Sequence, residues 1–100
     1  MSAVAQLSIF PIGKEESLSP YVARAVRIIA ESGLDYKLGP MGTVIEGEWP
    51  QVLQTVSQCM EEMQKDSDRV YMVLTVDWRN APSGRIKRKT ESVMDKIQAL

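Results

Sequence analysis

A short stretch near the middle of the chain predicts a tight turn followed by a strand that carries a carboxylate. Pro40 and Gly42 are turn residues, and Val44 and Ile45 favour a strand. Glu46 follows them directly. A half-buried charge is costly unless it is paired or hydrogen-bonded, so a carboxylate in a β-branched run needs a partner or a ligand. The stretch therefore predicts a β-hairpin and, next to it, a polar site on the sheet.

Turn residues and alternating apolar residues divide the rest of the chain into further strands and helices. Ser19-Pro20 and Trp49-Pro50 each precede an amphipathic stretch, and proline is favoured in the first turn of a helix. Ser19 is expected to cap the first helix, and Gly33 is expected to end it. The expected strands span residues 3–12, 35–38, 43–48 and 69–78, and the expected helices start at residues 19, 49 and 85.

This order of elements, β-α-β-β-α-β followed by a helix, predicts one ferredoxin-like α+β domain over residues 1–100. Its four-stranded antiparallel sheet would carry the two main helices on one face, and the third helix would be a C-terminal addition. The residues expected to face the helices are Leu7, Ile9, Ile45, Met72, Leu74 and Val76. The residues expected on the opposite face, called the open face below, are Gln6, Ser8, Phe10, Val44, Glu46, Tyr71, Val73, Thr75 and Asp77.

The expected open face is too apolar to be left in water and too polar for a simple core. Phe10, Val44, Tyr71 and Val73 would form an apolar patch on it. Packing against the same face of a second copy would bury this patch, and the third helix could help to hold the pair. The pattern predicts a homodimer or homotetramer that assembles through its sheet faces.

Composition excludes several classes of function. The net charge of −1 gives no basic excess for nucleic acid, and the absence of histidine excludes a Ser-His-Asp triad and imidazole metal ligands. The single cysteine, Cys59, cannot form an internal disulfide and is expected to be buried and inert. No apolar run is long enough to span a membrane, and no leader segment is recognisable, so we expect a cytoplasmic protein.

Several motifs resemble a known family. Residues 8–13 (Ser-Ile-Phe-Pro-Ile-Gly), 19–22 (Ser-Pro-Tyr-Val), 42–47 (Gly-Thr-Val-Ile-Glu-Gly) and 77–79 (Asp-Trp-Arg) resemble the small thiamine-binding proteins related to YkoF. The resemblance runs nearly end to end. It implies a ferredoxin-like subunit, assembly through the sheets, and binding of thiamine or its hydroxymethylpyrimidine half. It implies neither catalysis nor a cofactor or metal.

Thiamine combines an aminopyrimidine ring with a cationic thiazolium ring. A site for it needs a hydroxyl or carboxylate for the amine, an aromatic face for stacking, and negative charge near the cation. Carboxylates, hydroxyls and aromatic rings of the predicted sheet and first helix can supply these groups. The candidate ligand-binding residues are Ser8, Phe10, Tyr21, Thr43, Glu46 and Asp77.

The carboxylates also have structural interpretations. Glu46 could pair with Arg69 or Arg79 as readily as with a ligand, and for Asp77 a pair with Arg79 is the favoured reading. Two other functions therefore stay open. One is a structural or regulatory module that assembles through its sheet without a ligand. The other is a small enzyme that uses Glu46 or Asp77.

Overall fold

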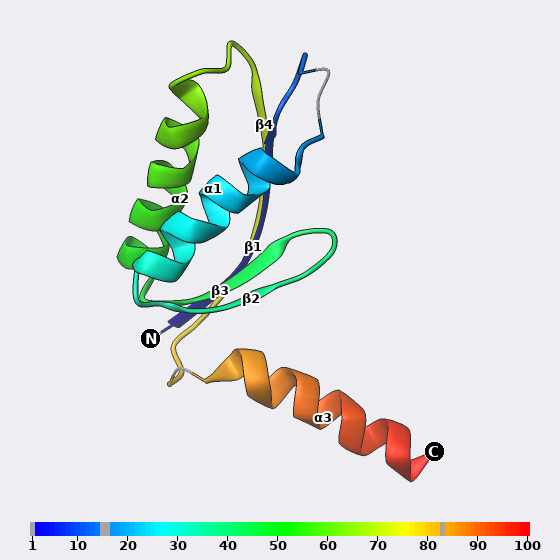
Figure 1. Cartoon of the computed structure of the whole chain (residues 1–100). Helices are drawn as coiled ribbons and strands as arrows, with labels where there is room; N and C mark the ends of the chain where they lie inside the picture. The colour runs from blue at the N-terminus through cyan, green and yellow to red at the C-terminus, as the bar shows by residue number, and fades with distance from the viewer. Residues whose placement is uncertain (1, 15–16, 83) are drawn as a thin grey trace.

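The computed structural model describes residues 2–14, 17–82 and 84–100, and it has the predicted ferredoxin-like order of elements with a third helix after the last strand (Figure 1). The strands and helices are β1 (Ser2–Pro11), α1 (Ser19–Glu31), β2 (Asp35–Leu38), β3 (Thr43–Gly47), α2 (Trp49–Gln64), β4 (Val70–Arg79) and α3 (Arg85–Ala99).

The four strands form one antiparallel sheet in the order β2-β3-β1-β4. The central strand β1 pairs with β4 along its whole length, from Ser2 opposite Arg79 to Pro11 opposite Val70. It pairs with β3 only as far as Leu7, which lies opposite Thr43. The second half of β1 therefore has a strand on one side only. Helices α1 and α2 cover one face of the sheet (Figure 1).

The core lies between that face and the two helices. Alternate residues of β1 point into it, and the buried apolar residues of the sheet and helices form one cluster. The predicted helix-facing residues all lie on this side of the sheet. Met72 and Val76, however, stay 36% and 43% exposed, because β4 is an edge strand that the helices cover incompletely. The buried members of the cluster are Ala5, Leu7, Ile9, Ala25, Ile29, Ile45, Val52, Val56, Cys59 and Met63.

Two details of the helices differ from prediction. Ser19 is already the first residue of α1, and the cap position falls on Leu18, whose side chain makes no capping hydrogen bond. The Ser19 amide instead donates to the Ser17 hydroxyl at 3.3 Å. Leu53, an apolar residue at a position where the helical pattern of α2 favours burial, is 44% exposed, whereas Thr55 is buried. The Thr55 hydroxyl can be buried because it donates to the Gln51 carbonyl at 3.0 Å.

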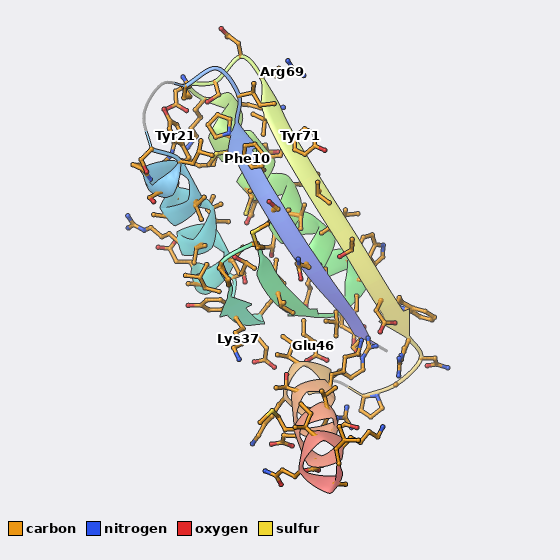
Figure 2. All side chains as sticks on the ribbon, turned by 90° about the vertical axis from the view of Figure 1, so that its right-hand side faces the viewer. Phe10, Tyr21, Lys37, Glu46, Arg69 and Tyr71 are labelled. Carbon is orange, nitrogen blue, oxygen red and sulfur yellow. The ribbon has the colours of Figure 1, made fainter. Side chains whose placement is uncertain are left out.

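The open face has the predicted composition, and α3 projects beside it. Phe10 and Tyr71 lie side by side on it with ring centroids 5.6 Å apart, and Tyr71 and Val73 are exposed (Figure 2). Helix α3 leaves the body of the domain at the end of the sheet where Glu46 lies (Figures 1 and 2). Its apolar residues Val93 and Ile97 are more than half exposed in the single chain.

We expect the Cys59 thiol to resist chemical modification while the protein is folded. Cys59 is fully buried on α2, and its thiol lies 3.6 Å from the Ala25 carbonyl. Burial raises the pKa of the Cys59 thiol to about 11, so roughly a thousandth of it is thiolate at pH 8. A disulfide reagent at pH 8 should react at least ~100-fold more slowly with native protein than with protein in denaturant. Equal rates would show that the thiol is accessible and would contradict the prediction that Cys59 is buried and inert.

Candidate functional site

The six predicted site residues do not form one cluster. Ser8, Phe10 and Thr43 border a groove at one edge of the sheet, and Glu46 and Asp77 lie at the end of the sheet where α3 begins. Figure 2 shows Phe10 towards one end of the sheet and Glu46 at the other, beside α3. Tyr21 belongs to neither group. The two groups therefore have to be considered separately.

The groove lies between the second half of β1, helix α1 and the β2–β3 turn, and its volume is about 1040 Å³. It opens where β3 stops pairing with β1, beyond Leu7 and Thr43. Apolar side chains form most of its wall, among them Val22 and Val26 of α1 and Met41 of the turn. Serine and threonine residues also line the groove and supply hydrogen-bonding groups. Of the predicted residues, Thr43 contributes its side chain, because it lies on the helix-covered side of β3.

Ser8 and Phe10 border the groove through the edge of their strand. Side chains alternate along β1, so the side chains of Ser8 and Phe10 project onto the open face. The Phe10 ring packs against Tyr71 there. Phe10 is therefore part of the aromatic pair on the open face and does not place a stacking surface inside the groove.

The alternation of hydrogen bonds along β1 exposes backbone groups to the groove. The Ile12 amide donates to the Arg69 carbonyl at 2.8 Å, which makes this pair hydrogen-bonded. Hydrogen-bonded pairs recur at every second residue of an antiparallel ladder, so Phe10 and Ser8 also direct their N–H and C=O towards β4. Ile9 must direct its N–H and C=O the other way, where β3 has already ended. One donor and one acceptor of the backbone thus face the groove side by side.

Tyr21 lies in the first turn of α1, partly buried against the core, and does not line the groove. The Lys14 ammonium and the Arg24 guanidinium lie 5.9 and 5.6 Å from the centre of its ring. Arg24 also binds Glu62 and Asp66 at the end of α2. The ring therefore helps to hold the α1–α2 connection.

Glu46 holds the first turn of α3. Its carboxylate accepts the amide of Arg85 at 2.9 Å and the amide of Ile86 at 3.3 Å. These are amides that the helix itself leaves without a partner, and a negative charge is favourable at a helix N-terminus. Glu46 is only 2% exposed. The two helix amides therefore satisfy the buried charge of Glu46. Its partner in the structure is the start of α3 and not Arg69 or Arg79.

Arg85 completes this joint with a buried guanidinium. Its Nη2 donates to the carbonyls of Ser2 at 2.6 Å and Asp77 at 3.0 Å, and its Nε donates to the Ser2 hydroxyl at 3.3 Å. Its Nη1 lies 3.4 Å from the Asp77 carboxylate. Sequence reasoning missed Arg85, although its place directly after Gly84, at the start of a helix, was a usable signal. The joint, as the term is used below, consists of Ser2, Glu46, Asp77 and Arg85.

Asp77 receives three cations. Arg85 is the first of them. The Arg79 Nε atom lies 3.5 Å from the Asp77 carboxylate, which agrees with the pair predicted from the sequence. The third is Lys89 of α3, whose ammonium forms a short ion pair with the same carboxylate. The Lys89 hydrogen bond, helped by the charges of Arg79 and Arg85, lowers the pKa of the Asp77 carboxyl below its ordinary value. A lowered pKa in the folded state means that Asp77 stabilises α3 at neutral pH. This contribution is lost as the pH falls through the lowered pKa.

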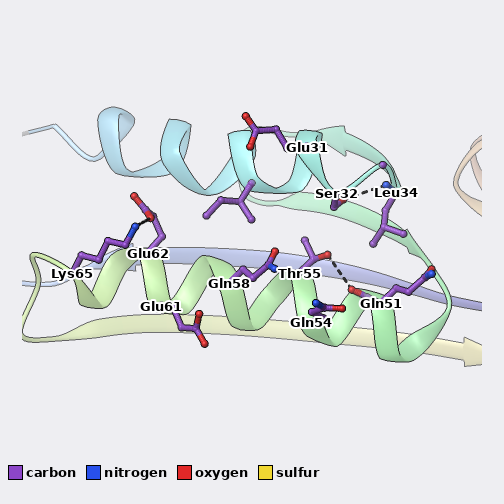
Figure 3. Close-up of a pocket in the computed structure, with 12 residues that line it drawn as sticks. Glu31, Ser32, Leu34, Gln51, Gln54, Thr55, Gln58, Glu61, Glu62 and Lys65 are labelled. Atoms are coloured by element: carbon purple, nitrogen blue, oxygen red, sulfur yellow. Dashed lines mark hydrogen bonds and ion pairs between the residues drawn. The ribbon is translucent and has the colours of Figure 1, made fainter.

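A second groove of about 680 Å³ runs between α1 and α2 on the outside of the domain (Figure 3). Amide and carboxylate side chains dominate it, and several of them are already bonded locally. The Lys65 ammonium pairs with Glu62 at 2.7 Å, and the Ser32 hydroxyl accepts the Leu34 amide at 3.2 Å. None of the six predicted residues lines it. The first groove is the better candidate for a binding site.

Residues 2–14, 17–82 and 84–100, which the structure describes, show neither a metal-ion cluster nor a membrane-spanning helix. They contain no group of three or more cysteine or acidic residues placed to hold a metal ion. No helix among them is long and apolar enough to cross a membrane.

Comparison with known proteins identifies the family. The family model for thiamine-binding proteins matches residues 5–94. The chain belongs to this family. The match covers the groove and every residue of the joint except Ser2, and it confirms the resemblance seen in the motifs.

The chain is similar to proteins of archaea and bacteria. It is 33% identical to a UPF0045 protein of Methanocaldococcus jannaschii over 90% of each chain, and 35% identical to YqgV of Bacillus subtilis over 96% of this chain and 98% of that one. The crystal structure of the M. jannaschii protein matches with a TM-score of 0.84 over 92% of this chain and 95% of that one. A candidate thiamine biosynthesis/salvage protein of Thermotoga maritima matches with a TM-score of 0.78 at 20% identity, over 91% and 99%, which supports the fold alone.

Proposed function

We propose that the protein binds thiamine or its hydroxymethylpyrimidine half without catalysing a reaction, as a carrier, buffer or sensor. The groove beside β1 is the site. The observation that carries the proposal is the backbone donor and acceptor of Ile9, which lie beyond the end of the β1–β3 pairing and have no partner among the described residues. They lie at the edge of an apolar groove, in a chain of the thiamine-binding family. A flat heteroaromatic ring with an amino group fits such a wall.

The chemistry of the aminopyrimidine is complementary to this strand edge. Its amino group is a donor, and the adjacent ring nitrogen is an acceptor. The carbonyl and amide of Ile9 can take both, and the apolar side chains of α1 and the turn can cover the ring faces. Thr43 offers a hydroxyl, and no hydrogen bond to it exists within the described part of the chain. Glu46 and Asp77 would contribute indirectly, because they are engaged in the joint.

Assembly through the open face is the second part of the proposal. Tyr71 and Val73 are exposed there, and the apolar residues Val93 and Ile97 of α3 are exposed beside it. A second copy packed on this face would bury both sets. An assembly without a ligand remains the alternative function that this surface favours.

Calorimetric titration tests the binding proposal, with thiamine and hydroxymethylpyrimidine as separate ligands. We expect saturable binding and a rise in the melting temperature. Thr43→Val should weaken binding by roughly 3- to 10-fold, because it keeps the shape of the side chain and removes one hydrogen-bonding group. Thr75→Val, the same change on the open face, is the matched control and should bind normally. Absence of heat and of stabilisation with both ligands would refute the proposal and favour the ligand-free assembly.

A further inference from the structure

The free edge of β1 in the groove has a direction. Ile9 turns both its N–H and its C=O towards the groove, because β3 stops pairing with β1 at Leu7. Within one extended residue the N–H comes before the C=O along the strand, so the donor lies nearer Leu7 and the acceptor lies nearer Phe10. Pro11, the next residue on the same side, has no N–H. The edge therefore offers a single backbone donor beyond Leu7, with its acceptor on the side of Pro11.

The two ends of the groove have different surroundings. At the donor end lies Thr43, opposite Leu7 on β3, and its side chain is only 4% exposed. Its hydroxyl borders the groove and has no hydrogen-bond partner in the described part of the chain. At the acceptor end, only residues 12–18 separate β1 from α1, and Leu18 and Ser19 border the groove where the helix begins (Figure 1). A strand therefore bounds the donor end, and the start of a helix bounds the acceptor end.

We propose that this direction fixes how an aminopyrimidine lies in the groove and which part of it the protein recognises. The inference rests on the proposed function, because it concerns the same site. In hydroxymethylpyrimidine and in thiamine, the ring nitrogen N3 is an acceptor, and the neighbouring 4-amino group is a donor. Only one order matches the strand edge: N3 accepts the Ile9 N–H, and the amino group donates to the Ile9 C=O. Turning the ring over would place donor against donor and acceptor against acceptor.

This order places the other sides of the ring at opposite ends of the groove. The second ring nitrogen, N1, and the 2-methyl group lie beyond N3 and point towards β3, where the Thr43 hydroxyl can donate to N1. The substituent at C5 lies beyond the amino group and points towards Leu18 and Ser19. Val22, one helical turn after Leu18, lies beside the ring itself.

The class of ligand follows from this placement. Ile9 and Thr43 together recognise a 4-aminopyrimidine, whereas the group at C5 extends past the start of α1 and is either a hydroxymethyl group or the thiazolium ring of thiamine. A 4-oxopyrimidine is excluded, because the hydrogen on its N3 would face the Ile9 N–H and its oxygen would face the Ile9 C=O. Thr43 is thus a specificity-determining residue of the groove.

Calorimetric titration of the unaltered protein with thiamine and with its 4-oxo analogue tests the contact to Ile9. We expect the analogue to bind at least ~100-fold more weakly, because both hydrogen bonds to the strand edge are lost and like groups face each other. Equal affinities would overturn the proposal while leaving the proposed function in place. If neither thiamine nor hydroxymethylpyrimidine binds, the proposed function itself fails.

Two tryptophan variants test the direction of the ligand. Leu18→Trp narrows the end that should hold the C5 substituent, and Leu38→Trp narrows the end at Thr43. Both leucines line the groove, and they are 38% and 57% exposed. Leu18→Trp should weaken thiamine binding by at least ~5-fold and hydroxymethylpyrimidine binding by less than ~2-fold. Leu38→Trp, the matched control, should change both affinities by the same factor.

The ratio of the two affinities decides the outcome. A ratio changed by Leu38→Trp and not by Leu18→Trp would show that the ligand lies the other way round. A ratio that neither variant changes would show that the C5 substituent extends towards neither end. Either result would overturn the proposal. Ser19→Trp gives the same readout if Leu18→Trp does not fold, with folding checked by circular dichroism.

Thr43→Ser tests the contact to N1. Serine keeps the hydroxyl, so this variant should bind both ligands normally, whereas Thr43→Val should weaken both by the same factor because N1 is common to them. A loss in Thr43→Ser equal to the loss in Thr43→Val would assign Thr43 a packing role and would reject it as the group that recognises N1.

Discussion

Replacing Glu46 by alanine is expected to free α3 from the sheet and to lower the free energy of unfolding by about 2–4 kcal/mol. The reason is that its carboxylate is buried and accepts the amides of Arg85 and Ile86. Removing it leaves two helix amides without a partner, and it leaves the buried Arg85 with less negative charge nearby. Amide hydrogen exchange along α3, with chemical denaturation, measures both effects.

Asp35→Asn is the matched control for this variant. Asp35 lies directly opposite Glu46 on β2, but it is exposed. Removing its charge should change stability by less than about 0.5 kcal/mol and leave the exchange of α3 as it was. If Glu46→Ala keeps normal protection of α3 and loses ligand affinity instead, Glu46 is a ligand-binding residue, and its contact with α3 is incidental.

Replacing Val22 by tryptophan is expected to reduce ligand affinity at least ~10-fold. Val22 lines the groove from the first turns of α1, and it is 37% exposed. A bulky ring at this place fills the space next to β1 and should exclude the pyrimidine. The affinity follows from calorimetric titration with hydroxymethylpyrimidine, and a factor of ten corresponds to about 1.4 kcal/mol.

Leu53→Trp is the control for the second variant. Leu53 is also an apolar helix residue, 44% exposed, but it lies on α2 away from the groove. Its substitution should leave affinity unchanged. If both tryptophan variants bind normally, the ligand does not occupy this groove. If both variants lose binding, the loss comes from a general effect of tryptophan on the packing of the helices and not from filling the groove.

The fold could be predicted from sequence because local signals agreed with one another. The alternation in β1 and β4 and the turn at Pro40 and Gly42 all point to one topology, which the structure has. Errors occurred where tertiary contacts outweighed local preference. Leu53 follows the helical pattern of α2, but no element of the sheet covers it.

The candidate site was harder to predict, because a sequence shows which groups are polar but not which partner satisfies them. The sequence indicates that the Glu46 carboxylate must have a partner, and it leaves Arg69, Arg79 and a ligand as possible partners. The partner in the structure is a backbone helix end 39 residues away, which no spacing rule reveals. Similarly, Ser8 and Phe10 border the groove through their strand edge, and a pattern of side chains cannot show that.

The joint also constrains when α3 can acquire its place during folding. Its groups come from both ends and the middle of the chain, at Ser2, Glu46, Asp77 and Arg85, so every strand except β2 contributes. Contacts between residues this far apart close large loops and form late. The last helix can therefore become ordered only once the three strands β3, β1 and β4 lie side by side. The ordering of α3 can therefore serve as a sign that the three strands β3, β1 and β4 have already assembled.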